Sequence, residues 1–178
     1  MTTWVALLRG VNVGGITIRS ADLASLFREE LGFDEARTFL ASGNVRFESD
    51  AGPGARDKLK GSIEKALRTR FGYDAWIVLV TLSEVRKAME GFPFDASDGS
   101  RQPWVVFCVD TATRDELAAA AASLDSTVDP VATGPGVVYW NPPKGSSTDT
   151  AFAKILAKTT YKSRTTNRNL RTLAKIAA

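Results

Sequence analysis

Hydrophobic and polar residues follow one another along this chain in a pattern that predicts short strands alternating with amphipathic helices. Apolar runs of strand length are separated by segments in which apolar residues recur every three or four positions. The elements predicted for the first half are a strand over 3–9, a helix from Ser20 to Gly32, strands over 36–41 and 45–48, a helix from Pro53 to Gly72, a strand over 75–80 and a short helix after the Thr81/Glu84 capping box.

A segment rich in Gly, Pro, Asp and Ser interrupts the pattern over residues 91–102, and the pattern then restarts. The elements predicted after it are a strand over 104–109, a helix capped by Thr113 and Glu116, strands over 128–132 and 137–140, a helix around Phe152, a final short strand near Tyr161 and a last helix carrying Leu170 and Leu173.

Both halves therefore show the order β-α-β-β-α-β followed by one more helix. This is the order of the ferredoxin-like, or split βαβ, unit. We expect an α+β protein built from duplicated ferredoxin-like subdomains with antiparallel sheets. The expected organisation is a first subdomain over 1–90, a linker over 91–102, and a second subdomain over 103–178 that ends in a basic helix.

Two polar loops in the first half are candidates for binding an anion. Because a crossover helix makes the first two strands parallel, both strands end at the same sheet edge. Glycine- and asparagine-rich loops that meet there offer free main-chain N–H groups to an anion, although glycines in loops more commonly serve only to allow tight turns. The candidate residues are Arg9, Gly10, Asn12, Gly14, Gly15, Ser42, Gly43 and Asn44.

The net charge of +3 is distributed unevenly. After Thr150 there are seven basic residues and no acidic one, so the rest of the chain carries an excess of acid. Such asymmetry suggests a polyanionic partner, and the alternative is a solvated helix face paired with the acidic body. We expect cations near the start of the last helix, which oppose the helix dipole unless an anion binds there. The candidate residues are Lys162, Arg164, Thr166, Arg168 and Asn169.

Several kinds of chemistry are disfavoured by the composition. The chain has no histidine, which removes Ser-His and Cys-His nucleophile pairs and the usual imidazole ligand of zinc and iron. We therefore expect no metal site and no cofactor. Cys108 cannot form an internal disulfide and lies in an apolar run, so we expect it to be buried with its thiolate disfavoured. The apolar stretch near the N-terminus is too short for a signal peptide, and we expect a cytoplasmic protein without a membrane segment.

Three motifs together resemble a known family. Residues 5–15, Ser42-Gly43-Asn44-Val45 with Phe47, and the segment 165–169 followed by Thr172 and Lys175 are similar to the signatures of the bacterial domain of unknown function 1697 (DUF1697) family. This chain has Leu170 where that family usually places Trp, and an additional Asn167. The resemblance implies two ferredoxin-like subdomains, in agreement with the pattern above, and it implies no activity.

Three classes of function remain open at this point. The first is binding of a phosphate-bearing ligand, either a nucleic acid or a nucleotide, and it is the one we favour. The second is an enzyme on a small phosphorylated substrate that uses Lys144, Asp149 or Tyr139, whose spacing identifies no reaction. The third is a regulatory or protein-interaction module without a small-molecule ligand. A fold shared by so many functions does not decide among them.

Overall fold

The computed structural model describes residues 1–10, 17–41, 43–72 and 74–178 and divides into two compact units. Unit 1 comprises Met1–Val85 with Lys175–Ala178, and unit 2 comprises Arg86–Ala174. The boundary between the two units thus lies within the helix that precedes the expected linker. The last four residues of the chain belong to the first unit. Within the described residues, no helix is both long and apolar enough to cross a bilayer.

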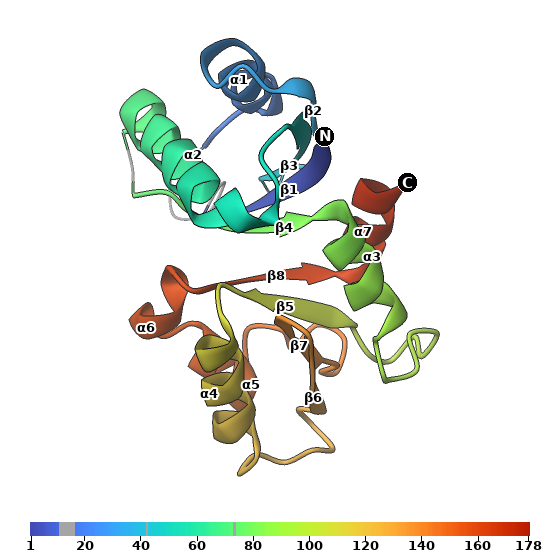
Figure 1. Ribbon diagram of the computed structural model, residues 1–178. Coiled ribbons are helices and arrows are strands. Elements are labelled where there is room, and N and C mark those ends of the chain that lie inside the picture. The colour runs from blue at the N-terminus through green and yellow to red at the C-terminus, as the bar shows by residue number, and fades with distance from the viewer. Residues whose placement is uncertain (11–16, 42, 73) are drawn as a thin grey trace. The chain divides into compact units, whose positions relative to one another are not determined.

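The first half of the chain forms one four-stranded sheet and its helices (Figure 1). Its elements are β1 (Thr2–Arg9), α1 (Ser20–Ser25) continued by a π-helical turn (Leu26–Glu30), β2 (Asp34–Thr38), β3 (Asn44–Ser49), a 3-10 turn (Pro53–Ala55), α2 (Arg56–Phe71), β4 (Trp76–Thr81) and α3 (Leu82–Glu90). The strand order is β2-β3-β1-β4, and all neighbours are antiparallel.

The second half repeats this arrangement. Its elements are β5 (Trp104–Cys108), α4 (Thr111–Ala121), β6 (Val131–Gly134), β7 (Val137–Trp140), α5 (Ala151–Leu156), α6 (Thr159–Lys162), β8 (Thr165–Asn169) and α7 (Leu170–Ala177). The strand order β6-β7-β5-β8 is again antiparallel throughout. The predicted fold of duplicated ferredoxin-like α+β units is confirmed.

The duplication extends to individual hydrogen bonds at the sheet edge. The N–H of Leu8 donates to the carbonyl of Gly43 (2.8 Å), and the N–H of Cys108 donates to the carbonyl of Gly136 (3.0 Å). Both glycines have positive φ, 76° and 72°, a region that favours glycine. Each hairpin therefore folds back onto the end of the first strand of its own unit.

Each sheet has one face covered by helices of its own unit, and the core lies between them. In unit 1 the core joins Trp4, Ala6 and Leu8 to apolar residues of α1 and α2, and in unit 2 it joins Val106 and Trp140 to residues of α4 and α5. Burial of these aromatic and aliphatic side chains is the main source of stability for each unit. Consecutive side chains on both faces of β1 and β5 are buried, which explains why these strands appear in the sequence as continuous apolar runs.

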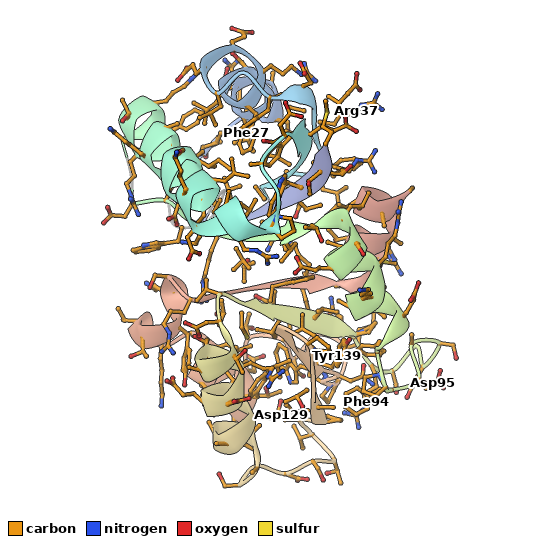
Figure 2. The ribbon with its side chains drawn as sticks, in the orientation of Figure 1. Phe27, Arg37, Phe94, Asp95, Asp129 and Tyr139 are labelled. Atoms are coloured by element: carbon orange, nitrogen blue, oxygen red, sulfur yellow. The ribbon has the colours of Figure 1, made fainter. Side chains whose placement is uncertain are left out.

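The opposite face of each sheet contacts the end of a trailing helix. In unit 1 the guanidinium of Arg46 donates to the main-chain oxygens of Ile176 (2.6 Å) and Ala178 (2.8 Å). In unit 2 the hydroxyl of Tyr139, labelled in Figure 2, donates to the carbonyl of Ala88 (2.8 Å). Arg46 pairs with Val5 in the first sheet, and Tyr139 occupies the corresponding position in the second. The helices concerned are α7 for Arg46 and α3 for Tyr139, so the two helices contact equivalent positions of the two sheets.

The final strand was predicted in the wrong place. Tyr161 lies in α6, and the strand is β8, which consists of the polar residues Thr165–Asn169. The strand exists because its main chain pairs with β5 over five residues, a tertiary contact that its hydrophobic pattern does not signal.

Other boundaries shifted for local reasons. Helix α4 begins at Thr111 because the carboxylate of Asp110 accepts hydrogen bonds from the N–H (2.8 Å) and hydroxyl (2.6 Å) of Thr113, so the predicted cap at Thr113 is wrong. By contrast, the Thr81/Glu84 capping box is confirmed: each main-chain N–H donates to the side chain of the other residue.

Candidate anion-binding site

The end of β1 and the first hairpin lie together, as the parallel arrangement of β1 and β2 predicts. Leu8 donates to Gly43, and the main chains of Phe39 and Asn44 are linked by a hydrogen bond of 2.9 Å. Arg9 and Gly10 continue from this point, and Gly10 is exposed with a φ of 81°. Of the candidates in this region, Asn12, Gly14, Gly15 and Ser42 lie outside the described residues.

One described candidate at this edge, Asn44, has a structural role, whereas Arg9 and Gly10 differ from it. Asn44 is fully buried, and its amide donates to the carbonyl of Phe39 (2.8 Å), which closes the hairpin. Arg9 is partly buried, and this burial lowers the pKa of its guanidinium. Arg9 is thus a cation held at the sheet edge, and Gly10 provides exposed main chain beside it.

Of the C-terminal candidates, Asn169 lies at the start of the last helix, whereas Lys162 and Arg164 precede β8 and Thr166 and Arg168 lie within it. Arg164 precedes β8, and its guanidinium forms a two-point ion pair with Glu116 (both 3.1 Å) and donates to the hydroxyl of Thr113 (3.0 Å). Arg164 therefore pairs with an acidic residue from the earlier part of the chain, which was the alternative to anion binding.

Two further candidates, Arg168 and Asn169, have partners in unit 2. Arg168 is only 7% exposed, and its guanidinium donates to the hydroxyl of Thr166 (2.7 Å) and to the carbonyl of Asn167 (2.9 Å). Burial lowers its pKa to about 10. The side-chain oxygen of Asn169 accepts from the N–H of Thr172 (2.8 Å) and so caps α7. Neither residue presents its side chain as an exposed anion ligand.

One of the C-terminal candidates, Lys162, has an exposed side chain. Lys158 and Lys154, which lie four and eight residues before Lys162, are also exposed; Lys158 directly precedes α6, and Lys154 lies in α5. Among the described residues, no acidic side chain pairs with any of the three. We call Lys154, Lys158 and Lys162 the lysine segment; in Figure 1, α6 leads directly into β8.

Comparison with known proteins bears on the family and the fold. A family model described as "Protein of unknown function (DUF1697)" matches residues 1–139. The chain belongs to this family. The DUF1697 match ends before the lysine segment and before β8.

A solved structure resembles this DUF1697 chain over nearly its whole length. It is described as that of the conserved bacterial protein SP0830 from Streptococcus pneumoniae, with a TM-score of 0.80 and 24% identity, and the match covers 99% of this chain and 97% of that chain. This likeness shows the shared fold, including the second unit. No curated protein matches the chain.

The enzyme alternative was based on Tyr139, Lys144 and Asp149. In this DUF1697 chain the first of these is buried and the other two are exposed. The hydroxyl of Tyr139 is committed to the carbonyl of Ala88, and burial raises its pKa. Lys144 and Asp149 are exposed in the loop that follows β7. The nearby carboxylate of Asp129, labelled in Figure 2, is buried and accepts from the indole of Trp140 (2.8 Å) and the N–H of Phe152 (3.2 Å). It therefore has a structural role.

Sequence reasoning counted Lys154 and Lys158 as part of the basic tail but left them out of the site. The signal for them was present as three lysines spaced four residues apart in a segment without acid. The Thr, Arg and Asn residues of 164–169 were chosen for the site instead. The sequence does not show that these residues cap a helix or pair with a strand within unit 2.

Proposed function

We propose that this protein binds the phosphate backbone of nucleic acids through the lysine segment of unit 2. The observation that carries the proposal is that Lys154, Lys158 and Lys162 are exposed and have no acidic partner among the described residues. They lie in the part of the chain after Thr150 that contains no acid at all.

Electrostatics favours an extended polyanion over a small ligand here. Exposed lysine ammonium groups are strongly hydrated point charges, so each gains little from a single ion pair in water. A polymer of phosphates engages several of them at once and releases its condensed counterions, and this release supplies most of the affinity. Contacts of this kind position the backbone and carry little sequence information.

The edge formed by Arg9, Gly10 and Gly43 belongs to unit 1 and is a second, separate candidate for a phosphate group. Exposed main chain beside a cation suits an anion. The proposal for the lysine segment does not depend on it, and the two regions are tested by different substitutions.

The test is a titration of fluorescently labelled oligonucleotides, as single-stranded DNA, duplex DNA and single-stranded RNA, followed by anisotropy at a series of salt concentrations. We expect binding at low salt, with log affinity falling linearly with log salt by about 0.9 per neutralised phosphate for duplex and about 0.7 for single strands. A parallel thermal-shift series with nucleoside phosphates tests the nucleotide alternative, because saturating ligand raises the melting temperature. No binding of any oligonucleotide at the lowest salt would contradict the proposal.

A further inference from the structure

The last strands of the two units, β4 and β8, occupy equivalent outer positions in their sheets. Each pairs with a single neighbour, β1 or β5, so the other edge of each strand has no strand beside it in its sheet. An open edge presents a row of main-chain N–H and C=O groups that can template another strand. The two edges differ in what satisfies these groups.

The edge of β4 is closed by side chains of α2. The buried carboxylate of Glu64 accepts from the N–H of Ile77 (3.1 Å). Arg56 donates to the carbonyl of Leu79 (3.3 Å), and Arg68 donates to the carbonyl of Ala75 just before the strand (3.1 Å). These side chains cover the edge at alternate residues, so an incoming strand has few groups left with which to pair.

Among the described residues, the edge of β8 is covered at its carbonyl groups only in part and not at its N–H groups: the carbonyl of Asn167 accepts from the guanidinium of Arg168 (2.9 Å). The N–H of Val109 donates to the carbonyl of Arg164 (2.9 Å), and the N–H of Leu170 donates to the carbonyl of Pro103 (3.2 Å). These bonds show which residues of β8 direct their main-chain groups toward β5. Because such bonds recur at every second residue, Asn167 and Asn169 direct their main-chain groups away from β5. No described group accepts from the N–H of either residue, and both residues are partly exposed. Helix α5 has six residues where α2 has sixteen, which accounts for the missing cover.

We propose that the open edge of β8 receives an extended acidic peptide, which adds a fifth strand to the sheet of unit 2. Main-chain pairing of this kind is a common mode of peptide recognition. The charge identifies the partner: exposed Lys158 and Lys162 precede the strand, exposed Arg171 follows it, and no acid lies among them. Pairing of β8 with a second copy of itself would bring these like charges together, whereas an acidic segment complements them.

This inference goes beyond nucleic-acid binding, because the recognising groups are main-chain N–H groups of β8 and not lysine side chains. The substitution Asn167→Pro removes one outward N–H and leaves the pairing with β5 intact, since proline is tolerated at the free edge of a strand. Asn167→Thr changes the same side chain and keeps the N–H, so it is the matched control.

In the experiment, displayed short peptides of random sequence are selected for binding to the full-length protein, and the affinity of synthetic copies of the enriched peptides is then measured. We expect the enriched peptides to contain Asp and Glu together with β-branched residues. Methylation of the peptide nitrogen at every second residue should weaken binding about tenfold or more, and methylation at the intervening residues should leave it unchanged. This alternation is measured on the unmodified protein, so it stands even if Asn167→Pro fails to fold.

The remaining outcomes each decide the inference. Loss of peptide binding in Asn167→Pro, with retention in Asn167→Thr and unchanged oligonucleotide affinity in both, supports it. Enrichment of no peptide, enrichment of basic peptides, or equal sensitivity to methylation at all positions overturns it. A dimer in sedimentation that Asn167→Pro dissociates also overturns it, because the occupant of the edge would then be a second copy.

Discussion

Arg164 and Glu116 form an ion pair in which two nitrogens of the guanidinium each lie 3.1 Å from a different carboxylate oxygen. This pair links the segment before β8 to α4, and it neutralises a cation that immediately follows the lysine segment. The basic C-terminal region therefore contains two arginines that are paired or buried, Arg164 and Arg168, beside exposed cations, namely its lysines and Arg171. We assign the proposed phosphate contacts to the exposed residues Lys154, Lys158 and Lys162.

The ion pair provides the first prediction. Substitution Glu116→Gln removes the acid beside Arg164, so we expect tighter oligonucleotide binding and a salt dependence steeper by about 0.9 for duplex DNA. Stability should change by less than about 1 kcal/mol because the pair is partly exposed. The control is Glu90→Gln, which changes the net charge equally at an exposed residue of α3. Equal effects of the two substitutions would show that Arg164 is not part of the binding surface.

The second prediction concerns Asn169, which the sequence placed in the anion site and whose side chain caps α7 (2.8 Å to the N–H of Thr172). We expect Asn169→Ala to lower the free energy of unfolding by about 1 kcal/mol, whereas Asn169→Asp retains an acceptor and stays near the original value. Urea denaturation measures both. If Asn169→Ala left stability unchanged and abolished oligonucleotide binding, the residue would be a ligand and not a cap.

The third prediction concerns Cys108, which is 7% exposed in β5. Burial, together with the nearby carboxylate of Asp110, raises the pKa of its thiol to about 12. Since only the thiolate reacts, we expect very slow labelling of the native protein by a thiol reagent near neutral pH and rapid labelling in denaturant. Rapid native labelling would contradict this placement.

The same shift has a consequence for stability. The folded protein keeps the thiol protonated while the unfolded chain ionises it near its ordinary pKa, so the contribution of Cys108 is complete below about pH 8.5 and is lost between there and about pH 12. The substitution Cys108→Ala should therefore flatten the decline of the melting temperature over this alkaline range. An unchanged decline would show that the thiol does not contribute to it.

The sequence was sufficient to predict the architecture because the strands that define it have strong patterns. The apolar runs of β1 and β5, the glycines that end the hairpins, and the Thr81/Glu84 capping box are local signals, and each appears in the structure as expected. The repetition of one element order in both halves then identified the duplicated ferredoxin-like fold.

The candidate site could not be predicted to the same degree. Strand β8 is polar throughout, so its existence depends on pairing with β5, and the burial of Arg168 follows from its position in that strand. The partner of Arg164 lies 48 residues away in the sequence on α4. Residue types identified a basic region, but only the tertiary contacts separate its exposed lysines from the structural arginines Arg164 and Arg168.

The central claim is that the lysine segment binds phosphate, and two triple variants of equal charge test it. In the test variant the lysines of the segment are replaced by Gln: Lys154→Gln, Lys158→Gln and Lys162→Gln. In the control variant three exposed lysines of α2 and α3 are replaced: Lys58→Gln, Lys65→Gln and Lys87→Gln. Because both variants lose three positive charges, a difference between them reports the location of the binding surface and not the net charge.

The decisive measurement is the slope of log affinity against log salt for duplex DNA bound to the original protein and to both variants. We expect the slope of the test variant to be smaller by about two to three, since up to three phosphate contacts are lost, and the control variant to keep the original slope. Equal slopes for the two variants, or a larger loss in the control variant, would contradict the claim that the lysine segment binds phosphate.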